Sequence, residues 1–134
     1  MPACDGPNMG RLDARPWHVL LVDDDVDLRD GLSEWLAGEG FSVGVAGDGI
    51  EALGEVEHAA YDAIVCDLDM PRLRGIELVR RIRGRGHDLV VVLLSGRFDL
   101  LASARDLGQV YALGKPCSGD RLVSTLREAL EERS

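Results

Sequence analysis

The sequence has few aromatic residues, no long apolar run and no excess of basic residues, and each scarcity excludes a class of protein. Aromatic residues make up 4% of the 134 residues and hydrophobic residues 46%, which predicts one domain with an ordinary, largely aliphatic core. The longest apolar run, from Leu89 to Leu94, is too short to cross a bilayer. We recognise no signal peptide and therefore expect a cytoplasmic protein.

The balance of charge narrows the possibilities further. The net charge of -9 argues against the basic surface that nucleic-acid binding requires. Four arginines within residues 80–85 are a local exception, whose helical spacing favours a solvated face first and a partner-binding patch second. The cysteines, Cys4, Cys66 and Cys117, are odd in number and lack metal-ligand spacing, so neither a disulfide framework nor a zinc site is indicated.

Apolar runs and amphipathic segments alternate along the chain. We predict strands over 17–22, 41–46, 63–67, 89–94 and 110–114. We predict helices from 28 to about 38, from 48 to about 58, over 75–83 and 100–107, and from 118 onward. This alternation is typical of a doubly wound α/β fold with a five-stranded parallel sheet in the order 2-1-3-4-5 and five helices, as in flavodoxin-like proteins. We assign residues 17–134 to this domain and 1–16 to a disordered leader.

Two of these helices carry recognisable local signals. Four apolar residues of the first helix have the i, i+4, i+7, i+8 spacing of a stripe that packs on a core: Leu28, Leu32, Trp35 and Leu36. At the start of the second helix, Asp48 is followed three residues later by Glu51, which predicts a capping box.

Polar residues stand at the carboxyl ends of four of the five strands. They are Asp23 and Asp24 after the first strand, Asp67 at the end of the third, Ser95 after the fourth and Lys115 after the fifth. In the predicted order the first and third strands are neighbours, so Asp24 and Asp67 should meet in the crevice where open parallel sheets bind ligands. Each residue alone has a structural explanation, as a cap, a turn residue or a loop cation. Their coincidence in one crevice favours a shared site.

The residue types at this crevice suit phosphoryl transfer. Three adjacent carboxylates repel one another unless a cation neutralises them, and a few partly solvated oxygen ligands suit Mg²⁺. With a hydroxyl and a cation beside them, one carboxylate can act as nucleophile and form an aspartyl-phosphate. Lys115 supports this interpretation, because it is the only lysine among 15 basic residues, the other 14 (15 minus 1) being arginines. The chain uses a compact point charge at this position alone.

With these motifs the sequence resembles the receiver domain of bacterial two-component response regulators, of the stand-alone, chemotaxis-regulator-like type. The resemblance covers about residues 17–132 and rests on Val22-Asp23-Asp24, Asp67 with Met70-Pro71 and Gly75, Ser95-Gly96, and Lys115-Pro116. It implies a phosphorelay function, in which a sensor histidine kinase or a histidine phosphotransfer protein donates the phosphoryl group.

The resemblance also implies a role for each site residue. Asp67 would be the phospho-acceptor, and Ser95 and Lys115 would contact the phosphoryl group. Mg²⁺ would be held at four positions, namely Asp23 (through water), Asp24, Asp67 and Asp69 (through its backbone carbonyl). The Lys115-Pro116 peptide is expected to be cis.

The match to the family is incomplete at the fifth strand. Receivers carry an aromatic residue three positions before the lysine, which rotates when the phosphoryl group draws the Ser or Thr hydroxyl inward. Here that position is Ala112, and its neighbour Tyr111 should point to the opposite face of the strand. Cys117 replaces a common phenylalanine. As a hypothesis, an Asp69–Arg97 ion pair shields the phosphoryl group from water.

Two alternative functions stay open. A pseudo-receiver would keep the fold as an interaction module that does not switch on phosphorylation. Asp67-Leu68-Asp69 also resembles the nucleophile motif of haloacid-dehalogenase-like phosphatases, although there the acidic pair comes last. On the receiver interpretation the protein is not an enzyme, because it catalyses only its own phosphorylation and dephosphorylation. Since the chain ends after the last predicted helix, we expect signalling through an unknown protein target, without direct nucleic-acid binding or membrane insertion.

Overall fold

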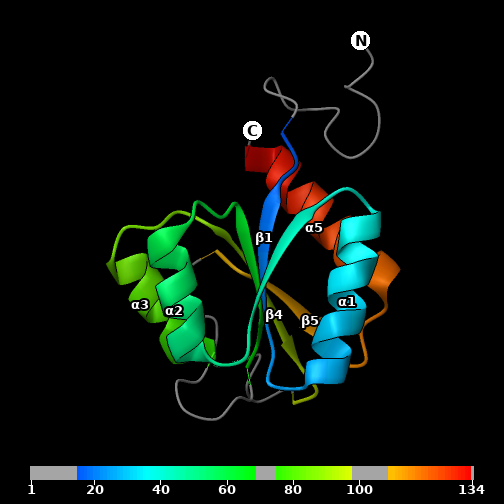
Figure 1. The fold of residues 1–134 in the computed structure, drawn as a ribbon, viewed down its shortest axis with the longest axis horizontal. Coiled ribbons are helices and arrows are strands. Elements are labelled where there is room, and N and C mark those ends of the chain that lie inside the picture. The colour runs from blue at the N-terminus through cyan, green and yellow to red at the C-terminus, as the bar shows by residue number, and fades with distance from the viewer. Residues whose placement is uncertain (1–14, 69–74, 98–108, 134) are drawn as a thin grey trace.

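The structure, a computed structural model, describes residues 15–68, 75–97 and 109–133, and its five parallel strands form one sheet in the order β2-β1-β3-β4-β5 (Figure 1). The strands are β1 (His18–Val22), β2 (Ser42–Ala46), β3 (Ala63–Asp67), β4 (Val90–Ser95) and β5 (Tyr111–Gly114). The helices are α1 (Val26–Gly38), α2 (Gly49–His58), α3 (Gly75–Gly84) and α5 (Gly119–Arg133). The predicted strand order and alternation are confirmed. The helix predicted over 100–107 and residues 1–14 of the predicted leader lie outside the described residues.

The sheet separates two hydrophobic cores. Helices α2 and α3 cover one face, and α1 and α5 cover the other (Figure 1). Side chains alternate along β1, so Leu20 packs toward α2 and α3 while Val19 and Leu21 pack toward α1 and α5. Because both faces are covered, β1, β3 and β4 are apolar except for one polar residue at an end of each strand. Each fully buried aliphatic side chain contributes about 1.5–3 kcal/mol.

The apolar stripe predicted for α1 is only partly buried. Leu36 is fully buried and Leu32 packs against the core, but Leu28 and Trp35 are 40% and 47% exposed. Trp35 instead lies against the first residue of α5, where a Cβ on Gly119 would come within 2.6 Å of the Trp35 Nε1 atom. Helix α5 shares this face of the sheet with α1. Only part of the predicted apolar stripe of α1 is therefore buried against the sheet.

The capping signal of α2 is confirmed with one difference. Asp48 is the N-cap, and its Oδ1 accepts a hydrogen bond from the Glu51 amide at 2.9 Å. The Glu51 carboxylate accepts a hydrogen bond from the amide of Gly47 at 3.0 Å, and Gly47 is one residue before the N-cap. Such capping contributes about 1 kcal/mol.

The arginines of residues 80–85 belong to the end of α3 and the turn that follows. Arg81 pairs with Glu77 within the helix, and Arg85 pairs with Glu57 of α2. Both pairs are at the surface, where each contributes about 0–1 kcal/mol. These contacts support the solvated-face interpretation of the segment.

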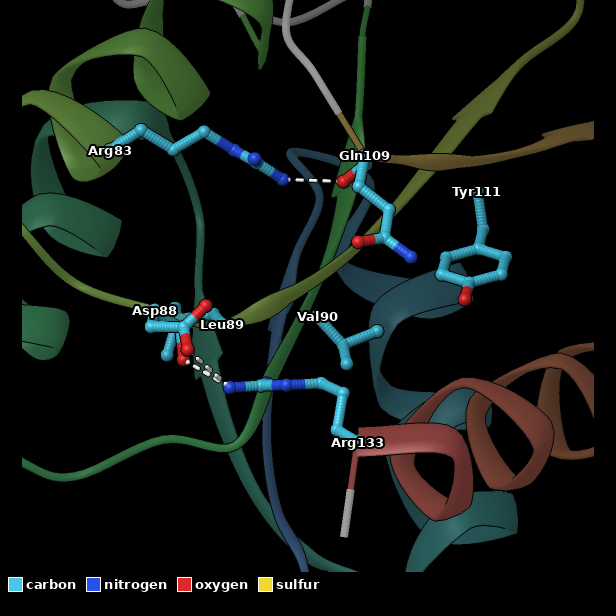
Figure 2. A pocket seen from close by; sticks show the side chains of 7 residues that line it. All are labelled: Arg83, Asp88, Leu89, Val90, Gln109, Tyr111 and Arg133. Carbon is cyan, nitrogen blue, oxygen red and sulfur yellow. Dashed lines mark hydrogen bonds and ion pairs between the residues drawn. The ribbon is translucent and has the colours of Figure 1, made fainter.

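The two ends of the sheet differ in character. A hollow of about 230 Å³ opens where β4 and β5 begin, and its two arginines are bonded to the protein itself (Figure 2). Arg83 donates to the Gln109 carbonyl, and Arg133 donates to the carbonyl and carboxylate of Asp88, both at 2.9 Å. The residues singled out by the sequence lie at the other end, where the strands finish. Within the described residues, no helix has the length and apolarity needed to cross a membrane.

Candidate functional site

Three carboxylates meet where β1 and β3 end. Val22 of β1 pairs with Cys66 of β3, so the residues that follow them are also neighbours. Asp23 and Asp67 are 1% and 4% exposed, whereas Asp24 is exposed. One carboxylate oxygen from each of the three lies within 4.8 Å of the others. The juxtaposition predicted from strand order is therefore present.

Asp23 has one oxygen that the protein does not satisfy. Its amide donates to the Ala46 carbonyl at 3.2 Å, and its Oδ1 accepts from the Asp25 amide at 2.9 Å. Its Oδ2 is buried and has no hydrogen-bond partner within the described part of the chain. Burial raises the pKa of Asp23, and the nearby charges of Asp67 and Asp24 raise it further against the opposing effects of the Asp25 amide and Lys115.

This donor set fits a small, hard cation. A buried carboxylate oxygen without a donor is unfavourable by about 1–3 kcal/mol, and a cation relieves that penalty together with the mutual repulsion of the three acids. Oxygen ligands on an open, partly solvated crevice suit Mg²⁺, which keeps several of its waters. Within the described residues, the candidate ligands for such an ion are Asp23, Asp24 and Asp67.

Lys115 provides the positive charge of the site. Its Nζ lies 2.9 Å from Oδ2 of Asp67, and its amide donates to the Ser95 carbonyl at 3.0 Å, which places it at the end of β5. Burial lowers the pKa of Lys115, but the hydrogen bond to Asp67 and the charges of the three acids outweigh burial and raise it. The ammonium therefore stays protonated. The Lys115-Pro116 peptide is cis, as expected.

Ser95 is buried at the end of β4, but its hydroxyl is engaged in its own loop. The Oγ atom accepts from the Arg97 amide at 3.0 Å and donates to the Arg97 carbonyl at 3.4 Å. Such local bonds are the usual turn chemistry of serine. Ser95 thus stands at the predicted position, and its contact with a phosphoryl group stays a prediction.

The start of α3 packs directly on the end of β3. A Cβ on Gly75 would lie 2.7 Å from the Asp67 carbonyl oxygen and 2.9 Å from the Leu68 Cα. Only glycine permits this approach of two backbones. Gly75 therefore helps to fix Asp67 at the site.

Comparison with known proteins assigns the family. Residues 19–127 match the family model described as "Response regulator receiver domain". The chain belongs to the response regulator receiver family. Receiver domains of this family are parts of two-component systems.

Relatives and solved structures agree with this assignment. The receiver is 36% identical over 121 residues to response regulator MprA of Mycobacterium sp. (strain KMS), covering 89% of this chain and 53% of that protein. It is 38% identical over 115 residues to MprA of Mycobacterium tuberculosis (strain ATCC 25618 / H37Rv), covering 84% and 50%. The chain therefore spans about half the length of the curated relatives it matches.

Two solved structures have the same fold. The chemotaxis protein CheY4 of Vibrio cholerae superposes with a TM-score of 0.80 at 29% identity, over 85% of this chain and 98% of that one. The receiver domain of NtrX from Brucella abortus superposes with a TM-score of 0.78 at 32% identity, over 84% and 98%. Both comparisons support the receiver fold described above.

The alternation predicted along the fifth strand is confirmed. Tyr111 packs toward α1 and α5, and its hydroxyl donates to Glu132 at 2.9 Å. Ala112 lies on the opposite face and is exposed. Within the described residues, no aromatic side chain stands on that face of β5.

The sequence alone did not settle the roles of some further residues near the site. Asp25 proves to be the N-cap of α1, accepting from the Leu28 amide at 3.2 Å. Arg29, one turn later, donates to the Asp23 carbonyl at 3.4 Å and was missed, although helix geometry directs its side chain back toward the acids. Asp69 lies outside the described residues, so its ligand role and its pairing with Arg97 stay predictions.

Proposed function

We propose that this receiver accepts a phosphoryl group on Asp67 from a phosphohistidine of a sensor kinase or a histidine phosphotransfer protein. The observation that supports this most directly is the contact of the Lys115 ammonium with Asp67, at 2.9 Å, beside the two further carboxylates. A nucleophilic carboxylate, a fixed cation and a metal-binding acid pair are what positioning-based phosphoryl transfer needs.

The proposed step conserves atoms and charge. A carboxylate oxygen of Asp67 forms a bond to phosphorus while the bond from phosphorus to the imidazole nitrogen breaks. The electron pair stays with the imidazole, which takes up a proton and leaves as neutral histidine. Lys115 pairs with a phosphoryl oxygen and offsets the negative charge that gathers there. Ser95 contributes after its hydroxyl leaves the Arg97 main chain and donates to a second phosphoryl oxygen.

The acid pair supports this step by holding a metal ion. We assign Mg²⁺ to Asp24 and Asp67 directly, to Asp23 through water and to the Asp69 backbone carbonyl. When bound, Mg²⁺ neutralises the developing charge on the phosphoryl oxygens. The unsatisfied, buried Oδ2 of Asp23 supports this assignment.

The phosphodonor must reach Asp67 past the start of α1. Leu28 and Trp35 lie seven residues apart on one face of α1, and they are 40% and 47% exposed. Because α1 begins two residues after Asp24, a protein covering these side chains can present a histidine to the site. We assign this surface to the kinase or phosphotransfer partner. In this proposal the chain signals through protein contacts and has no enzymatic turnover beyond its own phosphorylation and dephosphorylation.

Intact-mass analysis after incubation with acetyl phosphate and Mg²⁺ tests the phospho-acceptor. We expect one phosphoryl adduct on the wild type, lost in Asp67→Ala and in the presence of EDTA. Asp48→Asn is a matched control, since Asp48 is a buried acid at the same end of the sheet and asparagine caps a helix equally well. Absence of an adduct on the folded wild type would favour the pseudo-receiver, and continuous turnover of a phosphate ester would favour the phosphatase.

A further inference from the structure

Arg29 is tied to both ends of the acidic turn that follows β1. Its amide donates to the Asp25 carbonyl at 2.9 Å, and this hydrogen bond closes the first turn of α1. Its Nη1 reaches back along the helix and donates to the Asp23 carbonyl at 3.4 Å. The side chain is 17% exposed, so the guanidinium is largely enclosed within the fold.

With this contact, every hydrogen-bonding group of Asp23 except one is held by the protein. The amide is bonded to Ala46, Oδ1 to the Asp25 amide and the carbonyl to Arg29. The remaining atom, Oδ2, is buried without a partner in the described part of the chain and belongs to the acid cluster. The backbone of Asp23 is thereby fixed on both sides of its Cα. These bonds fix the position of Oδ2 within the acid cluster.

The space around the guanidinium is shaped by the end of β2. A Cβ on Gly47 would lie 3.1 Å from Arg29 Nη1 and 3.8 Å from Glu51 Oε2. Glycine at this position leaves room for the guanidinium against the backbone. The ends of β1 and β2 thus enclose Arg29 on the side of the site opposite Lys115.

We propose that Arg29 is a positioning residue, which acts through the Asp23 carbonyl to hold the Asp23–Asp25 turn in the geometry that binds Mg²⁺. This inference rests on the proposed function of the acid cluster as a magnesium site. Arg29 is not among the candidate ligands and would act only through Asp23. Partners of this kind, one bond removed from the ligands, commonly change metal affinity by about 10–100-fold.

The chain contains a matched control for this proposal. Arg127 of α5 is also partly enclosed, and its Nη2 donates to the Glu39 carbonyl at 3.2 Å and to the Glu39 carboxylate at 2.9 Å, so it makes at least as many contacts as Arg29. Like Arg29, it has a buried Nε atom with no hydrogen-bond partner within the described residues. It joins α5 to the far end of α1, away from the acid cluster. Arg127→Gln therefore removes a comparable structural bond without touching the turn.

Mg²⁺ binding measured by titration calorimetry on the full chain, without any phosphodonor, tests the proposal. We expect Arg29→Gln to weaken Mg²⁺ binding by roughly tenfold and Arg127→Gln to leave it unchanged. In the acetyl phosphate reaction, Arg29→Gln should raise the Mg²⁺ concentration needed for half-maximal rate while retaining the maximal rate. Arg29→Lys, which keeps the charge and one donor, should recover part of the affinity and serves if the glutamine variant does not fold.

Two results would overturn the proposal. One is wild-type Mg²⁺ affinity in folded Arg29→Gln, and the other is equal loss of affinity in Arg127→Gln. Failure of the wild type itself to bind Mg²⁺ would overturn the magnesium assignment and this inference together. That outcome is distinct, because it does not depend on the identity of residue 29.

Discussion

The Lys115 ammonium and the Asp67 carboxylate form a 2.9 Å ion pair between the ends of β5 and β3, two strands separated by β4. The lysine therefore lies against the proposed phospho-acceptor in the structure. We expect Lys115→Ala to slow phosphorylation by acetyl phosphate by roughly a hundredfold, the effect of losing one charge-stabilising donor.

Lys115→Arg should restore only part of this rate, because a planar guanidinium is larger than the ammonium point charge that fits between the two strands. The rate of adduct formation, followed by intact mass, measures both effects. Arg121→Ala, an exposed cation on α5, is the control and should react like the wild type. Wild-type rates in Lys115→Ala would remove the lysine from the mechanism.

A second prediction concerns the contact of α3 with the end of β3. Gly75→Ala should destabilise the fold by about 1–3 kcal/mol, since its Cβ would lie 2.7 Å from the Asp67 carbonyl oxygen and the backbones would have to separate. Gly31→Ala in α1, where nothing lies within 4 Å, should instead stabilise by about 0.5–1 kcal/mol. Urea denaturation measures both. Equal effects of the two substitutions would contradict the close approach.

Much of the fold and of the site can be predicted from the sequence, because the strands that build the sheet also carry the site residues at their ends. Short apolar runs bounded by turn residues, such as 63–66, are typical of strands buried on both faces, and in a parallel sheet the acids that end them lie at one end of the sheet. Strand order then brings Asp24 to Asp67. Alternation along β5 likewise assigns Tyr111 and Ala112 to opposite faces before any coordinates are known.

Features that depend on distant packing or on a single torsion are not encoded locally. The exposure of Trp35 depends on where α5 lies, some eighty residues later in the chain. The Ser95 hydroxyl can rotate to its own loop or to a phosphoryl oxygen, and no sequence pattern chooses between them. The contact of Arg29 with Asp23 needs the direction of a helical side chain as well as its position.

A third prediction concerns alkaline pH. The Tyr61 hydroxyl donates to Glu55 at 2.7 Å, and burial, followed by this bond and the Glu55 charge, raises the pKa of Tyr61 well above 10.0. A raised pKa means that the folded state binds the phenolic proton more tightly than the unfolded state. This stabilisation is complete below about pH 10 and is lost as the pH rises through the folded pKa.

The free energy of unfolding, measured by denaturant titration at several pH values, tests this. Tyr61→Phe should lose about 0.5–1.5 kcal/mol at neutral pH through the missing hydrogen bond. Above pH 10 the wild type should lose stability more steeply than the variant. Parallel curves for the two proteins would show that Tyr61 does not carry the alkaline dependence.

The last prediction separates partner docking from phosphoryl chemistry. Trp35 is 47% exposed and lies nine residues after the start of α1, so its removal should leave the site intact. Trp35→Ala should therefore react with acetyl phosphate at the wild-type rate. With a sensor kinase that phosphorylates the wild type, transfer should slow by roughly tenfold, since an exposed aromatic at an interface often contributes more than 1 kcal/mol. Val45→Ala, which removes an exposed apolar side chain from the edge strand β2, is the control and should slow neither reaction. A Trp35→Ala variant that is phosphorylated normally by the kinase would exclude this part of α1 from the docking surface, whereas one that is slow with both donors would show that Trp35 supports the site itself.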